Sequence, residues 1–171
     1  MPTIEVSVNG KSIALAGGEG FDLLSLSVLS SRDYADAVVL LTGRRKTDEV
    51  IQWLNTRVMR GDEVALVLRH RGTSTTVPDA LPSWPVQGNN GADHTKSSQS
   101  SASSFTVRYA AHVARVSADP TGTLMVTATW RPLYEKCKLE VTRIPEQDSD
   151  LNKCWIEFSV DFDEPVLIEI G

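Results

Sequence analysis

The chain has 171 residues, of which 41% are hydrophobic and 23% charged, and its formal net charge is −5. This composition excludes a disordered chain and favours a globular protein with a sizeable core. The acidic balance argues against a nucleic-acid partner, because binding to phosphates needs clustered Lys and Arg, and the densest basic run, Arg44-Arg45-Lys46, is followed at once by Asp48 and Glu49.

The N-terminal segment is predicted to begin with β-strands. Residues 3–8 alternate apolar and polar side chains, Asn9-Gly10 is a type I′ turn signal, and residues 11–16 return alongside the first strand. Residues 21–31 alternate again. Residues 36–43 are apolar on both faces, which is typical of a central strand.

An amphipathic helix is predicted over about residues 48–60, and the fold class depends on it. Ile51, Leu54 and Val58 recur at the spacing of one helix face. Acidic residues at the start and arginines near the end complement the helix dipole. Gly61 would then take a positive φ just beyond the last turn.

This helix would end at Arg60-Gly61-Asp62, a tripeptide that many extracellular adhesion ligands display on a loop. We interpret it as a structural joint, in which Gly61 turns the chain and Asp62 leads into a strand over residues 63–70. An adhesion role would require secretion and an exposed loop tip, and the sequence indicates neither.

A candidate domain boundary lies at residues 87–104, which are rich in Ser, Gly and Asn and nearly free of large apolar side chains. This composition is typical of a flexible linker or loop. It divides the chain into an α+β subdomain, residues 1–86, and a β-rich subdomain, residues 105–171. The second segment is marginal as an independent β-domain, so we expect its sheet of about five strands to dock on the first. The predicted fold class is α+β, predominantly antiparallel β.

No catalytic or metal-binding motif occurs at a recognisable spacing, so we expect no metal and no cofactor, and we favour a non-catalytic protein over an enzyme. His70, His94 and His112 are scattered along the chain. Cys137 and Cys154 are too few for a disulfide scaffold. We expect both thiols to be free; the alternative is one disulfide between them in an oxidising compartment.

The N-terminus shows no signal-peptide pattern, and no run of 18 apolar residues is present, so we expect a cytoplasmic protein without a membrane partner.

Acidic loops supply most of the candidate partner-binding residues. Residues 146–150 and 161–164 carry closely spaced carboxylates, which would attract a basic protein or, as a less favoured alternative, bind calcium. Trp84, between prolines, is either an interface anchor or a residue that holds the end of its domain to the core. The candidate residues are Trp84, Asp148, Asp150, Asp161, Asp163 and Glu164.

The favoured function is a non-catalytic protein-binding module of inhibitor, immunity or accessory type, which engages a basic partner through acidic loops or a sheet edge. The alternative is a small enzyme or small-ligand-binding protein with a site between the two halves, built from groups such as Arg69, Arg115, Glu140 and Glu157. A lectin-like surface would need export and exposed aromatic side chains.

Overall fold

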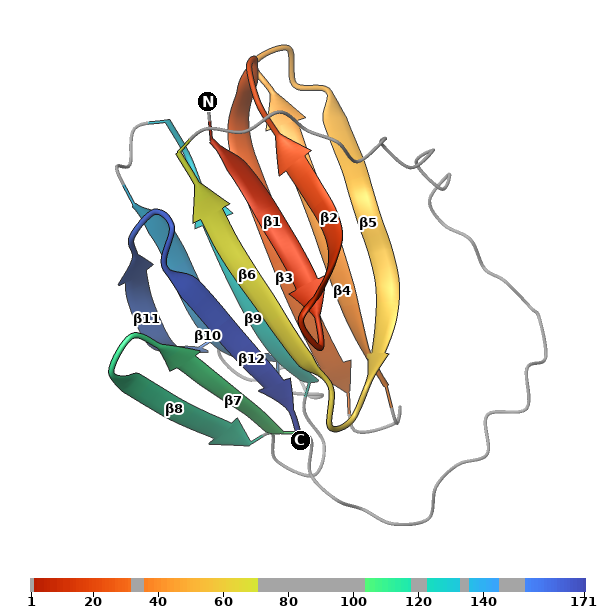
Figure 1. Cartoon of the computed structure of the whole chain (residues 1–171), viewed down its shortest axis with the longest axis vertical. Coiled ribbons are helices and arrows are strands. Elements are labelled where there is room, and N and C mark those ends of the chain that lie inside the picture. Colours follow the sequence, from red (N-terminus) through yellow and green to blue (C-terminus); the bar gives the residue numbers. More distant parts are fainter. Residues whose placement is uncertain (1, 32–35, 71–103, 118–122, 133–135, 145–152) are drawn as a thin grey trace, which may run out of the picture.

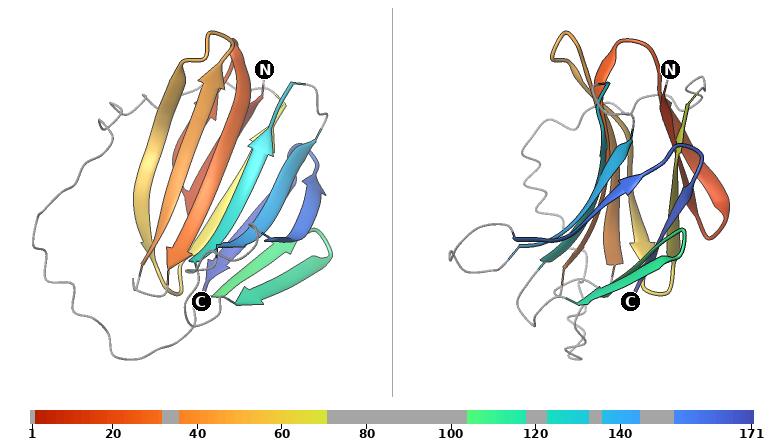
Figure 2. Two further views of the ribbon diagram at one scale, coloured as in Figure 1. Left: turned by 180° about the vertical axis from the view of Figure 1, so that it is seen from behind. Right: turned by 90° about the vertical axis from the view of Figure 1, so that its left-hand side faces the viewer.

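The computed structural model describes residues 2–31, 36–70, 104–117, 123–132, 136–144 and 153–171. In these ranges the chain forms twelve β-strands, all paired antiparallel, and no helix. The strands form two six-stranded sheets that pack face to face as a β-sandwich (Figures 1 and 2).

Sheet A has the strand order β2-β1-β6-β12-β7-β8. Its strands are β1 (Thr3–Val8), β2 (Lys11–Gly17), β6 (Glu63–Arg69), β7 (Ser104–Tyr109), β8 (His112–Ser117) and β12 (Pro165–Ile170). Sheet B has the order β11-β10-β9-β3-β4-β5. Its strands are β3 (Phe21–Ser31), β4 (Asp36–Arg45), β5 (Val50–Met59), β9 (Thr123–Trp130), β10 (Cys137–Ile144) and β11 (Lys153–Val160).

The core lies between the two sheets, and the alternation along each strand creates it. On β4, for example, Ala37, Val39 and Leu41 are buried, whereas Val38 and Leu40 on the other face are only half-buried. The buried side chains of both sheets form one contiguous cluster. Because β4 lies between β3 and β5, its apolar outer face agrees with the prediction of a central strand.

The predicted helix at about residues 48–60 is wrong, and with it the α+β class: the described fold is all-β. Residues 50–59 form β5, whose register with β4 shifts between Leu41 and Thr42 and leaves Trp53 as an extra residue. A bulge of this kind reverses which residues face the core. Ile51 pairs with Gly43 before the bulge, and residues 54 and 58 pair with Leu41 and Ala37 after it.

The apolar residues at the inward positions of β5, residues 51, 54 and 58, are therefore spaced by three and four residues, which is the period of a helix face. The inward position between residues 54 and 58 is the polar Thr56, which pairs with Val39. The remaining composition favours a strand, since β5 is rich in β-branched and aromatic residues. Residues 46–49 are the β4–β5 turn rather than a helix cap: Asp48 takes a positive φ of 64° and its N–H donates to the Arg45 carbonyl oxygen at 2.9 Å.

The Arg60-Gly61-Asp62 tripeptide forms the turn that carries the chain from β5 in sheet B to β6 in sheet A. Gly61 has the expected positive φ, 87°, and its N–H donates to the Ile170 carbonyl oxygen at 2.8 Å. The Asp62 carboxylate accepts hydrogen bonds from the Met59 N–H at 2.7 Å and the Asn9 amide at 2.8 Å. These contacts confirm the structural joint, although it follows a strand and not a helix.

Each sheet contains strands from both sides of residues 87–104. In sheet A, β6 pairs with β12, and in sheet B, β3 pairs with β9. The predicted boundary itself, apart from Ser104, lies outside the described residues, so the division into residues 1–86 and 105–171 stays a prediction.

In the parts of the chain that the structure describes, no helix is long and apolar enough to cross a membrane.

Candidate partner-binding surface

The acidic turn between β11 and β12, residues 161–164, holds three of the predicted partner-binding residues. The Asp161 carboxylate lies 2.8 Å from the Lys136 ammonium, and this contact is the main cause of its lowered pKa. The Asp161 N–H donates to the Tyr109 hydroxyl at 2.8 Å, and that hydroxyl donates back to the carboxylate at 3.3 Å. Asp161 therefore ties this turn to the end of β7.

Asp163 is also engaged within the molecule. Its N–H donates to the Leu68 carbonyl oxygen at 2.8 Å, and its carboxylate lies 3.5 Å from the Arg69 guanidinium. Arg69 contacts Glu5 more closely, at 2.8 Å, and this hydrogen bond is the main cause of its raised pKa. Glu164 is exposed and makes no hydrogen bond or ion pair with a described residue. Of the three acids, it is the one whose carboxylate contacts no described residue.

The other predicted partner-binding residues, Trp84, Asp148 and Asp150, lie outside the described residues and stay predictions.

The polar residues proposed for a small-molecule site do not converge. Glu140 and Glu157 are cross-strand neighbours on the outer face of sheet B, where both contact the Lys138 ammonium, at 2.8 and 3.2 Å. Arg69 and Arg115 lie on the outer face of sheet A, on β6 and β8. The structure thus brings the two glutamates together and places the two arginines in the opposite layer.

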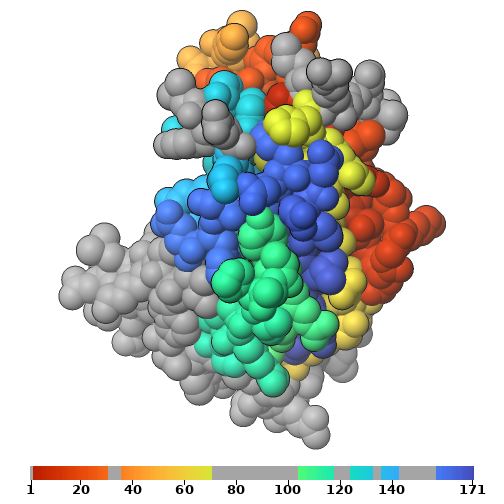
Figure 3. All heavy atoms as spheres, turned by 60° about the vertical axis from the view of Figure 1, so that its left-hand side comes forward, coloured from red at the N-terminus to blue at the C-terminus, as the bar shows by residue number. Residues whose placement is uncertain are grey.

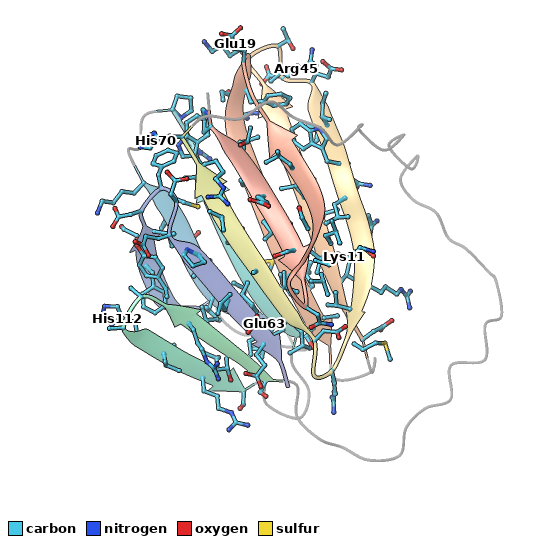
Figure 4. All side chains as sticks on the ribbon, viewed as in Figure 1. Lys11, Glu19, Arg45, Glu63, His70 and His112 are labelled. Atoms are coloured by element: carbon cyan, nitrogen blue, oxygen red, sulfur yellow. The ribbon has the colours of Figure 1, made fainter. Side chains whose placement is uncertain are left out.

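The described histidines lie apart, at the labelled positions in Figure 4. The His70 ring stacks on Phe162 with centroids 3.7 Å apart, and the His112 ring lies 6.3 Å from Phe158. Among the described residues, no group of three or more His, Cys, Asp and Glu side chains lies close enough to hold a metal ion. His94 lies outside the described residues.

Cys137 is a free thiol buried in the core, and burial raises its pKa to about 12. It pairs with Val160, whereas the backbone of Cys154 pairs with Thr142, five positions further along β10 (137 to 142). The prediction of a free, core-packed Cys137 is confirmed.

The four edge strands differ in a way that the sequence did not reveal. Edge strands are open to pairing with another chain, and β-bulges are one device that blocks this. A register shift interrupts the pairing of three edge strands, β2, β5 and β11, with their neighbours. The extra residues at these shifts are Ile13, Trp53 and Trp155, respectively. Along all of β8, in contrast, the pairing with β7 is regular.

β8 also carries the most exposed large apolar side chain among the described residues, Val113, which is 66% exposed. Arg115, two residues further on, is exposed as well. Figure 3 shows the β7–β8 hairpin on the surface of the molecule. The hairpin lies beside the acidic turn, through the contact of Tyr109 with Asp161. We call the outward side of β8, residues 112–117, the β8 edge.

Sequence reasoning missed the β8 edge because residues 105–116 alternate as one long strand. They form a hairpin instead, in which Tyr109 pairs with His112 across the two-residue turn Ala110-Ala111. Ala110 takes a positive φ of 49°, a conformation that turn sequences usually signal with Gly or Asn. Neither residue occurs at this turn, so the sequence carries no signal for the reversal of the chain.

No protein-family model matches the chain, and no curated protein or solved structure shows significant similarity to it.

Proposed function

We propose that this protein is a non-catalytic protein-binding module whose partner adds an extended segment to sheet A at β8. The observation that supports this proposal is the combination of an unbulged edge with an exposed Val113. In strand addition, main-chain hydrogen bonds supply affinity and the side chains of the edge strand supply specificity.

The surrounding structure suits β8 to this role. β8 is the second strand of a hairpin whose first strand, β7, is bonded along its length to β12. The hairpin tip is also attached to the β11–β12 turn through the Tyr109 hydroxyl. A partner strand would therefore meet an ordered edge, so that little ordering entropy is lost on the side of this protein.

A basic partner at the acidic turn, the other surface predicted from sequence, has less support. Asp161 and Asp163 already contact Lys136 and Arg69, so a basic protein would have to compete with these ion pairs. Of the acids at this turn, only Glu164 has a carboxylate without a contact to a described residue. The inhibitor, immunity or accessory role and the cytoplasmic location predicted from the sequence remain part of the proposal.

The test is Val113→Lys, because a lysine on an edge strand opposes the addition of another strand. The matched control is Val50→Lys, which places the same charge on the bulged edge strand β5, where Val50 is 48% exposed. Proteins that the wild type captures from its native lysate are identified by mass spectrometry, and the complex is then studied by amide hydrogen exchange.

We expect Val113→Lys to lose the captured partner and Val50→Lys to retain it, with slower exchange at the β8 amides in the complex. Equal capture by all three proteins, or unchanged exchange along β8, would contradict strand addition at this edge.

A further inference from the structure

We infer that the segment added at β8 carries an acidic side chain opposite Arg115 and an apolar side chain opposite Val113. This inference rests on the proposed function and specifies the chemistry of the partner at that edge.

The geometry of the edge defines two neighbouring positions on the outer face of sheet A. Val113 pairs with Arg108 of β7, and Arg115 pairs with Thr106. An added strand would extend each of these rows by one residue, and directly opposed side chains on one face of a sheet contact each other. In an antiparallel strand, the residue opposite Arg115 comes two positions before the residue opposite Val113.

Each of these rows contains one arginine, and Arg108 and Arg115 differ in what they already contact. Arg108 lies 3.2 Å from Glu169 on β12, so its charge has a partner within the sheet. Arg115 makes no ion pair or hydrogen bond with a described residue, and β8 contains no acidic residue. The exposed guanidinium therefore favours a carboxylate on the incoming strand and disfavours an ammonium group.

The absence of acidic residues from β8 also argues against a second copy of this chain as the strand that is added at the β8 edge. Two copies that pair through their β8 strands bring no carboxylate to Arg115, because the sequence His112–Ser117 has none. An extended acidic segment of another protein supplies both required groups, the carboxylate and the apolar side chain.

The experiment uses three fluorescein-labelled probe peptides and the full-length protein. Each peptide is Gly-Thr-Thr-Xaa-Thr-Val-Thr-Thr-Gly, with Glu, Gln or Lys at Xaa, so that Xaa and Val can lie opposite Arg115 and Val113. Binding is measured by fluorescence anisotropy, and the contacted amides are identified by NMR. Arg115→Glu reverses the charge at the edge, and Arg131→Glu is the control, because Arg131 is exposed and makes no ion pair with a described residue.

We expect the wild type and Arg131→Glu to bind the Glu probe about fivefold to tenfold more tightly than the Lys probe, with the Gln probe between them. Arg115→Glu is expected to reverse this order. Added salt should reduce the preference, because the two charges are exposed.

The other outcomes separate the inference from the proposed function. Equal affinity for the three probes, with shifts at the β8 amides, overturns the acidic preference and leaves strand addition in place. No binding and no shift along β8 contradicts both. A dimer detected by ultracentrifugation without peptide, and lost in Val113→Lys, identifies a second copy as the occupant and overturns the inference.

Discussion

Single residues at turns hold neighbouring strands of this sandwich together. Asp62 joins two turns, since its carboxylate accepts hydrogen bonds from Asn9 of the β1–β2 turn and from the Met59 N–H. The side-chain hydrogen bond from Asn9 is the main reason why the pKa of Asp62 is lowered from 3.8. A carboxyl whose pKa is lower in the folded state stabilises the protein above its unfolded pKa and loses this effect as the pH falls.

We therefore predict that Asp62→Ala lowers the Tm by about 3 °C at pH 7. The difference from the wild type should shrink as the pH falls below 3.8, through the folded pKa of Asp62. Thermal denaturation followed by circular dichroism across this range measures it. Glu164→Ala, which removes an exposed carboxylate without a described contact, should leave the Tm nearly unchanged at pH 7. A Tm difference for Asp62→Ala that persists undiminished at pH 2 would contradict the linkage.

Cys137 provides a second residue-level prediction. It is 1% exposed, and its pKa of about 12 keeps the thiol protonated at neutral pH. In a Cys154→Ser background, where one thiol remains, we expect no reaction with a disulfide reagent at pH 8 until denaturant unfolds the chain. Because the folded pKa is raised from 9.0, Cys137 also destabilises the fold as the pH rises above 9. Rapid labelling of the native protein would contradict its burial.

At the scale of one element, β5 shows how a bulge imitates a helix. Trp53 is the extra residue, and its ring lies over Gly43 of β4 and 4.9 Å from the Phe21 ring. A Cβ added at Gly43 would lie 2.7 Å from two atoms of the Trp53 ring. The bulge therefore depends on a glycine in the facing strand.

We predict that Gly43→Ala destabilises the protein by about 1–3 kcal/mol, because an added methyl group overpacks this contact. We expect Trp53→Phe to remove the ring atoms that clash. By itself this substitution destabilises the protein, because the smaller ring buries less apolar surface. In urea denaturation, the double variant should be more stable than the sum of the two single effects implies. Strictly additive effects would show that Gly43 and Trp53 do not interact.

At the scale of the whole molecule, the two segments of the chain share both sheets. β6 lies between β1 and β12, and β3 lies between β4 and β9. Neither residues 1–86 nor residues 105–171 can complete a six-stranded sheet alone.

We predict that residues 1–86 and residues 105–171, each expressed alone, are largely unfolded. Mixing the two fragments should restore the β-sheet circular dichroism signal and a cooperative unfolding transition. Two fragments that fold separately, each with its own transition, would contradict this dependence.

Most strands could be predicted from the sequence, because the alternation of apolar residues is a local signal. The sequence also placed the Asn9-Gly10 hairpin turn, where both residues take positive φ as a type I′ turn requires, and the positive φ of Gly61. Strand prediction from the alternation of apolar and polar side chains fails where the register of a strand shifts, or where the chain reverses without a residue typical of turns. The bulge at Trp53 gave the apolar inward residues of β5 the spacing of a helix face. The Ala110-Ala111 turn contains no Gly or Asn, so the start of β8 was not predicted.

In contrast, the tertiary structure was needed to show which strands are edges, which acids are paired and which charge has no partner among the described residues. Asp161 and Asp163 appeared as free carboxylates until the fold brought Lys136 and Arg69 beside them. The exposure of Val113 and Arg115 depends on β8 being the last strand of sheet A. These properties arise from pairings between residues far apart in the chain, and the local pattern of side chains does not encode them.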